Sequence, residues 1–395
     1  MLNINMADVI KILELCRPYL IAFGVVFVLA VITMIAVRKM EVAKRKMVRA
    51  QSILATILAL VIVANFICIG PMSTILSLAT QKVEVLSEET KNKSNEDCRE
   101  IAREGIVLLE NEGLLPLSDT KNLNVFGWAS TNPIYGGTGA GALNDLFHKV
   151  SLLEGLENAG FHLNTQLSDL YTSYEKQRAD YGVDWKLPEV PVAQYSEELI
   201  NGAKEFSDTA VVVIARWGGE AHDLPTNMAD VTYTNNSNEY ADFTDGQHYL
   251  ELSKTEKDML TMVCENFERV VLVYNGLSTF ELGFVEEYPQ IQGVLWCAGP
   301  GQTGFDSLGE ILKGTINPSG KTSDTFVYDL TQTPTWNNFG SFIYDNMDEY
   351  KIDESDPYVG GSVPTFVNYV EGIYVGYRFY ETAAHEGFID YDKTV

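Results

Sequence analysis

The stretch that decides the fold is AVVVIARWGGEAHDLP, residues 210–225. Its first six residues are all apolar, and Arg216, Trp217, two glycines and three ionisable residues follow them. An uninterrupted apolar run is typical of a strand that is covered on both faces, as in a parallel sheet. Because open parallel sheets form their sites beyond the carboxyl ends of their strands, the polar loop is expected to border a site.

Strands and helices alternate along the rest of the chain from Cys98 onward. Ser253 and Glu256 form an S-x-x-E capping box that predicts the start of one helix. The pattern predicts an α/β fold, a mostly parallel sheet sandwiched by helices. Further strands are expected at 122–128, 269–276 and 291–301, and helices at 98–111, 151–161, 254–267 and 304–314.

Four loops should meet at the carboxyl edge of this sheet, namely 127–141, 216–223, 275–279 and 298–303. Every α/β protein has loops of this kind, so their convergence locates a site without identifying its chemistry.

The N-terminal region predicts an all-α transmembrane hairpin over residues 1–81, with spans at about 19–37 and 52–76. Both runs are free of charge and long enough for a hydrocarbon core that needs about 20 helical residues. A signal peptide would have a shorter apolar core. Two buried core helices are the alternative, although charge-free runs of this length are rare in soluble domains.

Charge predicts the topology of this hairpin. Basic residues between the spans favour a cytoplasmic loop, which places both ends of the hairpin outside. These residues are Arg38, Lys39, Lys44, Arg45, Lys46 and Arg49. The remainder after residue 80 holds 20 basic and 51 acidic side chains, a net charge of −31. We therefore expect a multi-pass protein of the cell membrane with an acidic extracytoplasmic domain. Nucleic acid is excluded as a partner, because its phosphates require a basic surface.

The polar segment 82–97 is expected to be a linker, 98–345 the α/β domain and 346–395 a C-terminal extension. No metal or cofactor site is predicted. The glycines in YGGTGAGA lack the G-x-G-x-x-G spacing of a nucleotide loop. The cysteines lack C-x-x-C spacing, and His222 has no second histidine at ligand spacing, so a surface histidine is the favoured interpretation.

Glu220 is the candidate with a position that suits chemistry. It follows a buried strand, and the nearby Trp217 is expected to give it apolar surroundings, which favour a neutral carboxyl. A neutral Glu can donate a proton to a leaving group. A solvated loop carboxylate is the alternative, and one carboxylate alone cannot hydrolyse a glycosidic bond by the usual two-carboxylate route.

Six co-linear stretches resemble the α/β-sandwich domain of glycoside hydrolase family 3, which includes β-glucosidases and β-xylosidases. The resemblance runs from about Cys98 to Glu381. The stretches are CREIAREGIVLLENEGLLPL, VFGWASTNPIYGGTGAGA, VVVIARWGGEAHD, HYLELSKTEKDML, GPGQTGFDSLGEILKGTINPSGKTSDTF and EGIYVGYRFYE.

The resemblance implies roles for particular residues. The family's S-G-E-G-x-D-R loop matches Gly219 to Asp223, so Glu220 inherits the role of general acid/base and Asp223 a supporting place. Arg216 and Trp217 are then expected to border or support the cleft. Leu224 stands where the family has Arg, and Ala221 where it has the second Gly. These two departures put the loop geometry and an ion pair to Asp223 in doubt.

In the glycine loop, Thr138 stands where many members have Ser, and it is expected to face the cleft. The family's nucleophile is an Asp on a separate (β/α)₈ barrel, so no nucleophile is expected in this chain. The order resembles permuted members, in which the sandwich precedes a fibronectin-III-like domain and the barrel. We expect the chain to be an N-terminal piece of a larger enzyme, or a product shortened by a stop codon.

Two functions are consistent with this resemblance. One is the acid/base half of a membrane-anchored retaining β-glycosidase, inactive alone, whose substrates are oligosaccharides or aryl β-glycosides such as β-glucosides and β-xylosides. The other is a non-catalytic surface protein that binds carbohydrate or a barrel partner.

Overall fold

The computed structural model describes residues 6–80, 86–137, 143, 147–177, 187, 189–220, 223–231, 242–338, 342–356 and 360–395. The chain divides into two compact units, Met1–Ser87 and Glu88–Val395, and each is described here by itself.

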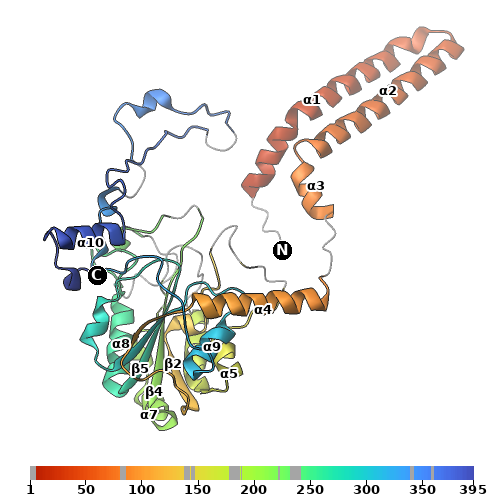
Figure 1. Cartoon of the computed structure of the whole chain (residues 1–395). Coiled ribbons are helices and arrows are strands. Elements are labelled where there is room, and N and C mark those ends of the chain that lie inside the picture. Colours follow the sequence, from red (N-terminus) through yellow and green to blue (C-terminus); the bar gives the residue numbers. More distant parts are fainter. Residues whose placement is uncertain are drawn as a thin grey trace. The chain divides into compact units, whose positions relative to one another are not determined.

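The first unit is built on two long helices, α1 (Met6–Ala36) and α2 (Val42–Ile69), which run side by side (Figure 1). Both are long and apolar enough to cross a membrane, over Glu14–Lys39 and Val42–Ile69. Helix α2 ends at Ile69, because Gly70 caps it and Pro71 cannot continue it. The predicted second span, 52–76, therefore crosses a break, and a short helix α3 (Ser73–Thr80) follows.

The second unit contains a six-stranded sheet in the order β1-β6-β5-β4-β2-β3. All neighbours are parallel except β1 and β6, so the prediction of an α/β fold with a mostly parallel sheet is confirmed. The strands are β1 (Val107–Asn111), β2 (Asn122–Phe126), β3 (His162–Leu163), β4 (Thr209–Arg216), β5 (Arg269–Gly276) and β6 (Ile291–Trp296).

Helices cover both faces of this sheet, with α5 and α9 on one side and α8 on the other (Figure 1). The predicted capping box is confirmed, since Ser253 and Glu256 cap the start of α8 reciprocally. The helices are α4 (Glu88–Gly105), α5 (Leu152–Asn158), α6 (Thr165–Gln177), α7 (Glu197–Phe206), α8 (Lys254–Asn266), α9 (Phe305–Lys313) and α10 (Tyr377–His385).

The region around residues 88–111 differs from its prediction. Helix α4 begins at Glu88, so most of the segment expected as a linker is helical. Arg103 holds α4 on α9 through an ion pair with Glu310, with 2.9 Å between Nε and Oε2. The predicted helix over 98–111 is wrong beyond Gly105, because Val107–Asn111 pairs with β6 as an antiparallel edge strand. Ile101 on α4 is 73% exposed, whereas Ile106, just after the helix, is buried.

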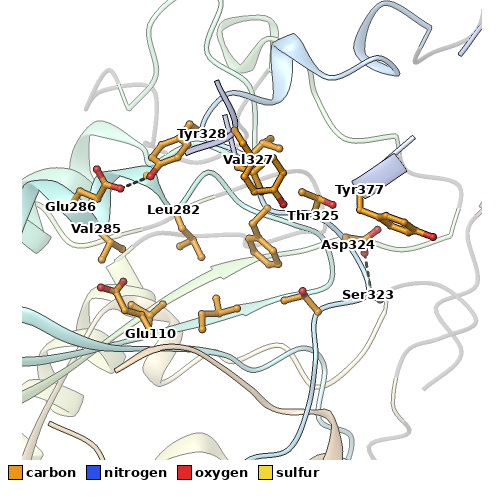
Figure 2. A pocket seen from close by; sticks show the side chains of 17 residues that line it. Glu110, Leu282, Val285, Glu286, Ser323, Asp324, Thr325, Val327, Tyr328 and Tyr377 are labelled. Carbon is orange, nitrogen blue, oxygen red and sulfur yellow. Dashed lines mark hydrogen bonds between the residues drawn. The ribbon is translucent and has the colours of Figure 1, made fainter. Parts of the chain in front are cut away.

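A cavity of about 580 Å³ opens beside this edge strand (Figure 2). Its walls come from β1, from residues 282–286, from residues 322–328 and from the C-terminal segment. Acidic and aromatic side chains face it, and the hydroxyl of Tyr328 donates a hydrogen bond to Glu286. None of the lining residues belongs to the predicted site.

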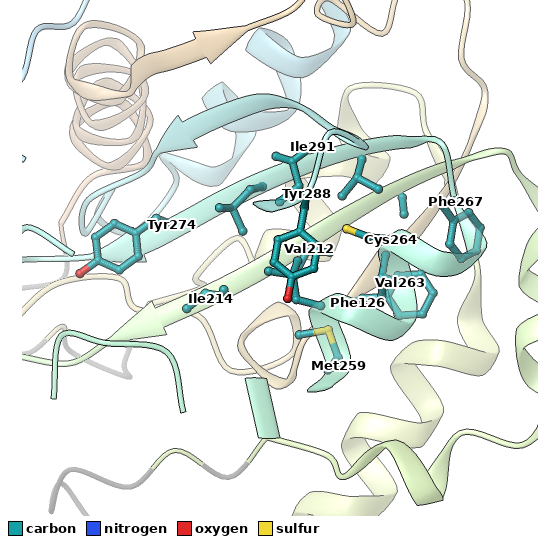
Figure 3. Close-up of a cluster of buried hydrophobic side chains, with 14 of the residues drawn as sticks. Phe126, Val212, Ile214, Met259, Val263, Cys264, Phe267, Tyr274, Tyr288 and Ile291 are labelled. Carbon is teal, nitrogen blue, oxygen red and sulfur yellow. The ribbon is translucent and has the colours of Figure 1, made fainter. Parts of the chain in front are cut away.

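Strand β4 carries the centre of the core, and all eight of its residues are buried. Because successive side chains point to opposite faces, Val212 and Ile214 pack in one layer and Val211 and Val213 in the other. Figure 3 shows the first layer, where β4 meets side chains of α8 such as Met259. Full burial of each such side chain contributes roughly 1.5–3 kcal/mol, which makes β4 a rigid base for the loop after it.

Candidate functional site

Three of the four loops predicted at the carboxyl edge of the sheet are joined by one buried side chain, Asn275 at the end of β5. Its Oδ1 accepts the N–H of Ile134 at 2.6 Å, and its Nδ2 donates to the carbonyl of Ile134 at 3.1 Å. Nδ2 also donates to the carbonyl of Cys297 at 2.9 Å. The loops after β2, β5 and β6 therefore meet at this edge.

The loop after β2 lies directly against β4. Gly127 has φ +96°, and a Cβ there would stand 2.2 Å from the carbonyl oxygen of Val213, so a side chain is excluded. Its N–H donates to the buried hydroxyl of Tyr171 at 2.7 Å. The next N–H, of Trp128, donates to the buried carboxylate of Glu189 at 2.8 Å. Thr138, expected to face the cleft, lies outside the described residues.

Arg216, the last residue of β4, points into the protein and is only 1% exposed. Its guanidinium donates to both carboxylate oxygens of Glu256, at 2.7 Å each, and lies 4.6 Å from the ring centre of Phe280. Burial alone would lower the pKa of Arg216, but the charge and hydrogen bonds of Glu256 raise it above its ordinary value. Arg216 thus supports the loop from below and does not line an open surface.

Trp217 and Glu220 follow on the loop. Trp217 is half-buried and packs on the second core layer, and its N–H donates to the hydroxyl of Tyr249 at 2.7 Å. Glu220 is exposed at a turn, not in the apolar surroundings expected from Trp217, and Asp223 is also exposed. The sequence predicted the position of Glu220 after a buried strand, but Trp217 packs inward on the core. Ala221 and His222, between these two acidic residues, lie outside the described residues.

The crevice beneath the loop has a volume of only about 10 Å³. Trp128, Glu189, Trp217 and Glu256 are among its lining residues. A volume of this size holds about one water molecule, so a sugar ring cannot enter.

Leu224, which stands where the resembling family has Arg, takes part in a small apolar cluster. It packs against the cluster formed by Leu187, Met228 and Tyr249. This end of the loop is thus held by apolar contacts of Leu224. An Arg at this position would instead be expected to form an ion pair with Asp223.

Tyr249 and Glu256 are the supporting residues that sequence reasoning missed. Both lie more than 30 positions from the strand end that they support, so no local pattern marks these contacts. The capping box identified Glu256 as a helix-start residue but gave no sign of its pairing with Arg216. Within the described part of the chain, no group of three or more His, Cys, Asp or Glu side chains could hold a metal ion.

Comparison with known proteins identifies the family. Residues 106–377 match the glycosyl hydrolase family 3 C-terminal domain. The chain is 30% identical over 301 residues to a β-glucosidase of Ruminococcus albus, covering 75% of this chain and 27% of that protein. It is 29% identical over 291 residues to β-glucosidase A of Butyrivibrio fibrisolvens, covering 72% and 32%.

Among solved structures, β-glucosidase 3B of Thermotoga neapolitana in complex with glucose is similar, with a TM-score of 0.55 and 28% identity. The match covers 74% of this chain and 36% of that one. The chain thus spans about a third or less of the length of these relatives. On the family match over residues 106–377, the chain belongs to glycosyl hydrolase family 3 and carries its C-terminal domain.

Proposed function

We propose that this chain is the acid/base-bearing half of a retaining β-glycosidase that acts on β-glucosides. The observation that carries the proposal is the placement of Glu220. It is exposed at the carboxyl end of β4, the most deeply buried strand of the sheet, at the position matching the family's acid/base residue. The β-glucosidase relatives support the choice of substrate class.

In this mechanism Glu220 acts twice. It first gives its proton to the glycosidic oxygen as the bond to the anomeric carbon breaks and a second carboxylate bonds to that carbon. Glu220, now ionised, then takes a proton from the water that releases the sugar. In retaining enzymes the two carboxyl groups are about 5–5.5 Å apart. We propose that a barrel domain outside this chain supplies the second carboxylate, on the solvent side of the loop.

Asp223 and Arg216 have different supporting roles in this proposal. Asp223 is exposed three positions after Glu220, and we propose that its charge supports the carboxyl of Glu220 from the same loop. Arg216 cannot touch substrate, because Glu256 and backbone carbonyls take up its hydrogen bonds inside the protein. Its role is to hold the end of β4 in place.

The test compares this chain with the longer protein that the proposal implies, which also carries the barrel domain and is called the full-length product. The chain alone is expected not to hydrolyse 4-nitrophenyl β-glucoside, whereas the full-length product should. Glu220→Gln in the full-length product should slow substrates with poor leaving groups most, because these need the proton. Glu265→Gln, at an exposed glutamate on α8, is the matched control and should be without effect. Hydrolysis by the chain alone, or full activity of Glu220→Gln, would overturn the proposal.

We also propose that α1 and α2 anchor the domain in the cell membrane, with the basic turn between them in the cytoplasm. Their apolar side chains are exposed along both helices, as a lipid-facing surface requires. Membrane-impermeant maleimide on intact cells tests this. Ser87→Cys should gain labelling over the parent protein and Met40→Cys should not. The reverse pattern contradicts the proposed topology.

A second candidate function, carbohydrate binding without catalysis, is favoured by Leu224. Its apolar packing replaces the charged residue of the family at this loop. Calorimetric titration with β-linked glucose oligosaccharides distinguishes the two functions. Binding by the chain, together with a full-length product that does not hydrolyse the same sugars, supports this candidate.

A further inference from the structure

We propose that Tyr249 is a positioning residue that holds both ends of the loop carrying Glu220. The inference rests on the proposed acid/base role of Glu220, and nothing in the family match or in the sequence patterns identifies Tyr249.

The contacts of Tyr249 bracket the loop. Its hydroxyl accepts the N–H of Trp217 at 2.7 Å, three residues before Glu220. Its own backbone N–H donates to the carbonyl of Pro225 at 3.1 Å, two residues after Asp223. One residue therefore fixes the separation of the two ends, while Glu220 and Asp223 between them remain exposed.

Tyr249 is itself held rigidly. It is 0% exposed, and its carbonyl accepts the Nε–H of Arg216 at 2.6 Å. The Arg216 guanidinium also lies 5.5 Å from the centre of the Tyr249 ring, and Glu256 fixes that guanidinium from its other side. Tyr249 thus accepts hydrogen bonds from Arg216 at the end of β4 and from Trp217 in the loop that follows β4.

The other end of the loop adds an apolar contact to this arrangement. Leu224 and Met228 pack with the Tyr249 ring in one cluster. Tyr249→Phe keeps the ring, the cluster and the backbone bond to Pro225, and removes the hydroxyl that accepts the Trp217 N–H. This substitution therefore separates the positioning contact from general packing.

The chain offers a matched control in Tyr171. It is another fully buried tyrosine whose hydroxyl accepts a backbone N–H just past a strand end, that of Gly127 after β2. The same hydroxyl also hydrogen-bonds the hydroxyl of Tyr195 at 2.7 Å. Tyr171→Phe should therefore affect Gly127 and Tyr195 and leave Trp217 unchanged.

The first measurement is hydrogen–deuterium exchange by mass spectrometry on the full chain in detergent micelles. In the unsubstituted protein the Trp217 amide should be protected, and Tyr249→Phe should speed its exchange about tenfold, the effect of one lost hydrogen bond. Rapid exchange of Trp217 in the unsubstituted protein overturns the proposal without any variant. Unchanged exchange at Trp217 in Tyr249→Phe, or equal acceleration throughout β4 and β5, also overturns it.

The second measurement separates positioning from a purely structural role. In the full-length gene product, Tyr249→Phe should lower kcat for poor leaving groups more than for good ones and leave KM nearly unchanged. Tyr171→Phe should show no dependence on the leaving group. If Tyr249→Phe speeds the exchange of the Trp217 amide but its effect on kcat does not depend on the leaving group, the positioning role is overturned. If Glu220→Gln is fully active while the Trp217 amide is protected from exchange, the proposed function is refuted. If Glu220→Gln is inactive but the Trp217 amide of the unsubstituted protein is not protected, only the positioning role of Tyr249 is refuted.

Discussion

Replacing Glu256 by Gln should destabilise the second unit more than any change at a surface ion pair. The substitution keeps the shape of the side chain but removes the charge that faces Arg216. Both side chains of this pair are almost completely buried, 0% and 6% exposed. Breaking a buried pair by removing one partner typically costs about 3–5 kcal/mol, because the remaining charge is left uncompensated.

The structure favours the lower end of this range. Arg216 keeps three backbone acceptors after the substitution, the carbonyls of Ala215, Tyr249 and Glu251. Gln can also still accept one hydrogen bond at position 256. We therefore expect a loss of about 3 kcal/mol in the free energy of unfolding, which in a unit of this size lowers Tm by roughly 5 °C.

Urea unfolding of the full chain in detergent, followed by tryptophan fluorescence, measures this loss. Glu287→Gln is the control, because Glu287 pairs with Lys257 at 3.2 Å on the surface, with side chains 58% and 51% exposed. An exposed pair contributes at most about 1 kcal/mol, so this control should shift the midpoint little. If Glu256→Gln and Glu287→Gln lowered the free energy of unfolding equally, the buried ion pair that we assign to Arg216 and Glu256 would be refuted.

Three further predictions follow from other contacts. Asn275→Ala should cost about 3 kcal/mol in urea unfolding, because it leaves several buried backbone groups of two loops unpaired, and a loss below about 1 kcal/mol would contradict this. Burial raises the pKa of the Cys264 and Cys297 thiols to about 12, so iodoacetamide at pH 8 should label them only after unfolding, and rapid labelling of the folded protein argues against it. Hydrogen bonds from Arg99 and Arg103 lower the pKa of Glu96 in the folded protein. The ionised Glu96 therefore stabilises the fold above the unfolded-state pKa of about 4.3, and this contribution is lost as pH falls through the lower folded-state pKa. Wild type and Glu96→Gln should accordingly differ in urea midpoint at pH 7 and converge in acid, and a constant difference would contradict this pairing.

Features encoded by neighbouring residues could be predicted from the sequence. The apolar run of β4 indicated a doubly covered strand, and Ser253 with Glu256 marked the start of α8. The alternation of these elements was sufficient to predict a mostly parallel sheet, since parallel strands require connections that cross the sheet.

Features that depend on distant pairing could not be predicted. Val107–Asn111 continues a helical pattern, and only its pairing with β6, almost 190 residues later, makes it a strand. Arg216 points inward because it pairs with Glu256, which is 40 positions away in the sequence. Tyr249, which also supports Arg216, is 33 positions away. The acid/base role proposed for Glu220 came from the family resemblance.

The most direct test of the central claim is product analysis of Glu220→Ala in the full-length gene product with added azide. A small anion can enter the space left by the carboxylate and attack the glycosyl-enzyme without needing a general base. The account predicts restored turnover and a glucosyl azide of retained anomeric configuration. Turnover of Glu220→Ala equal to the unsubstituted protein, with no azide product, would contradict it.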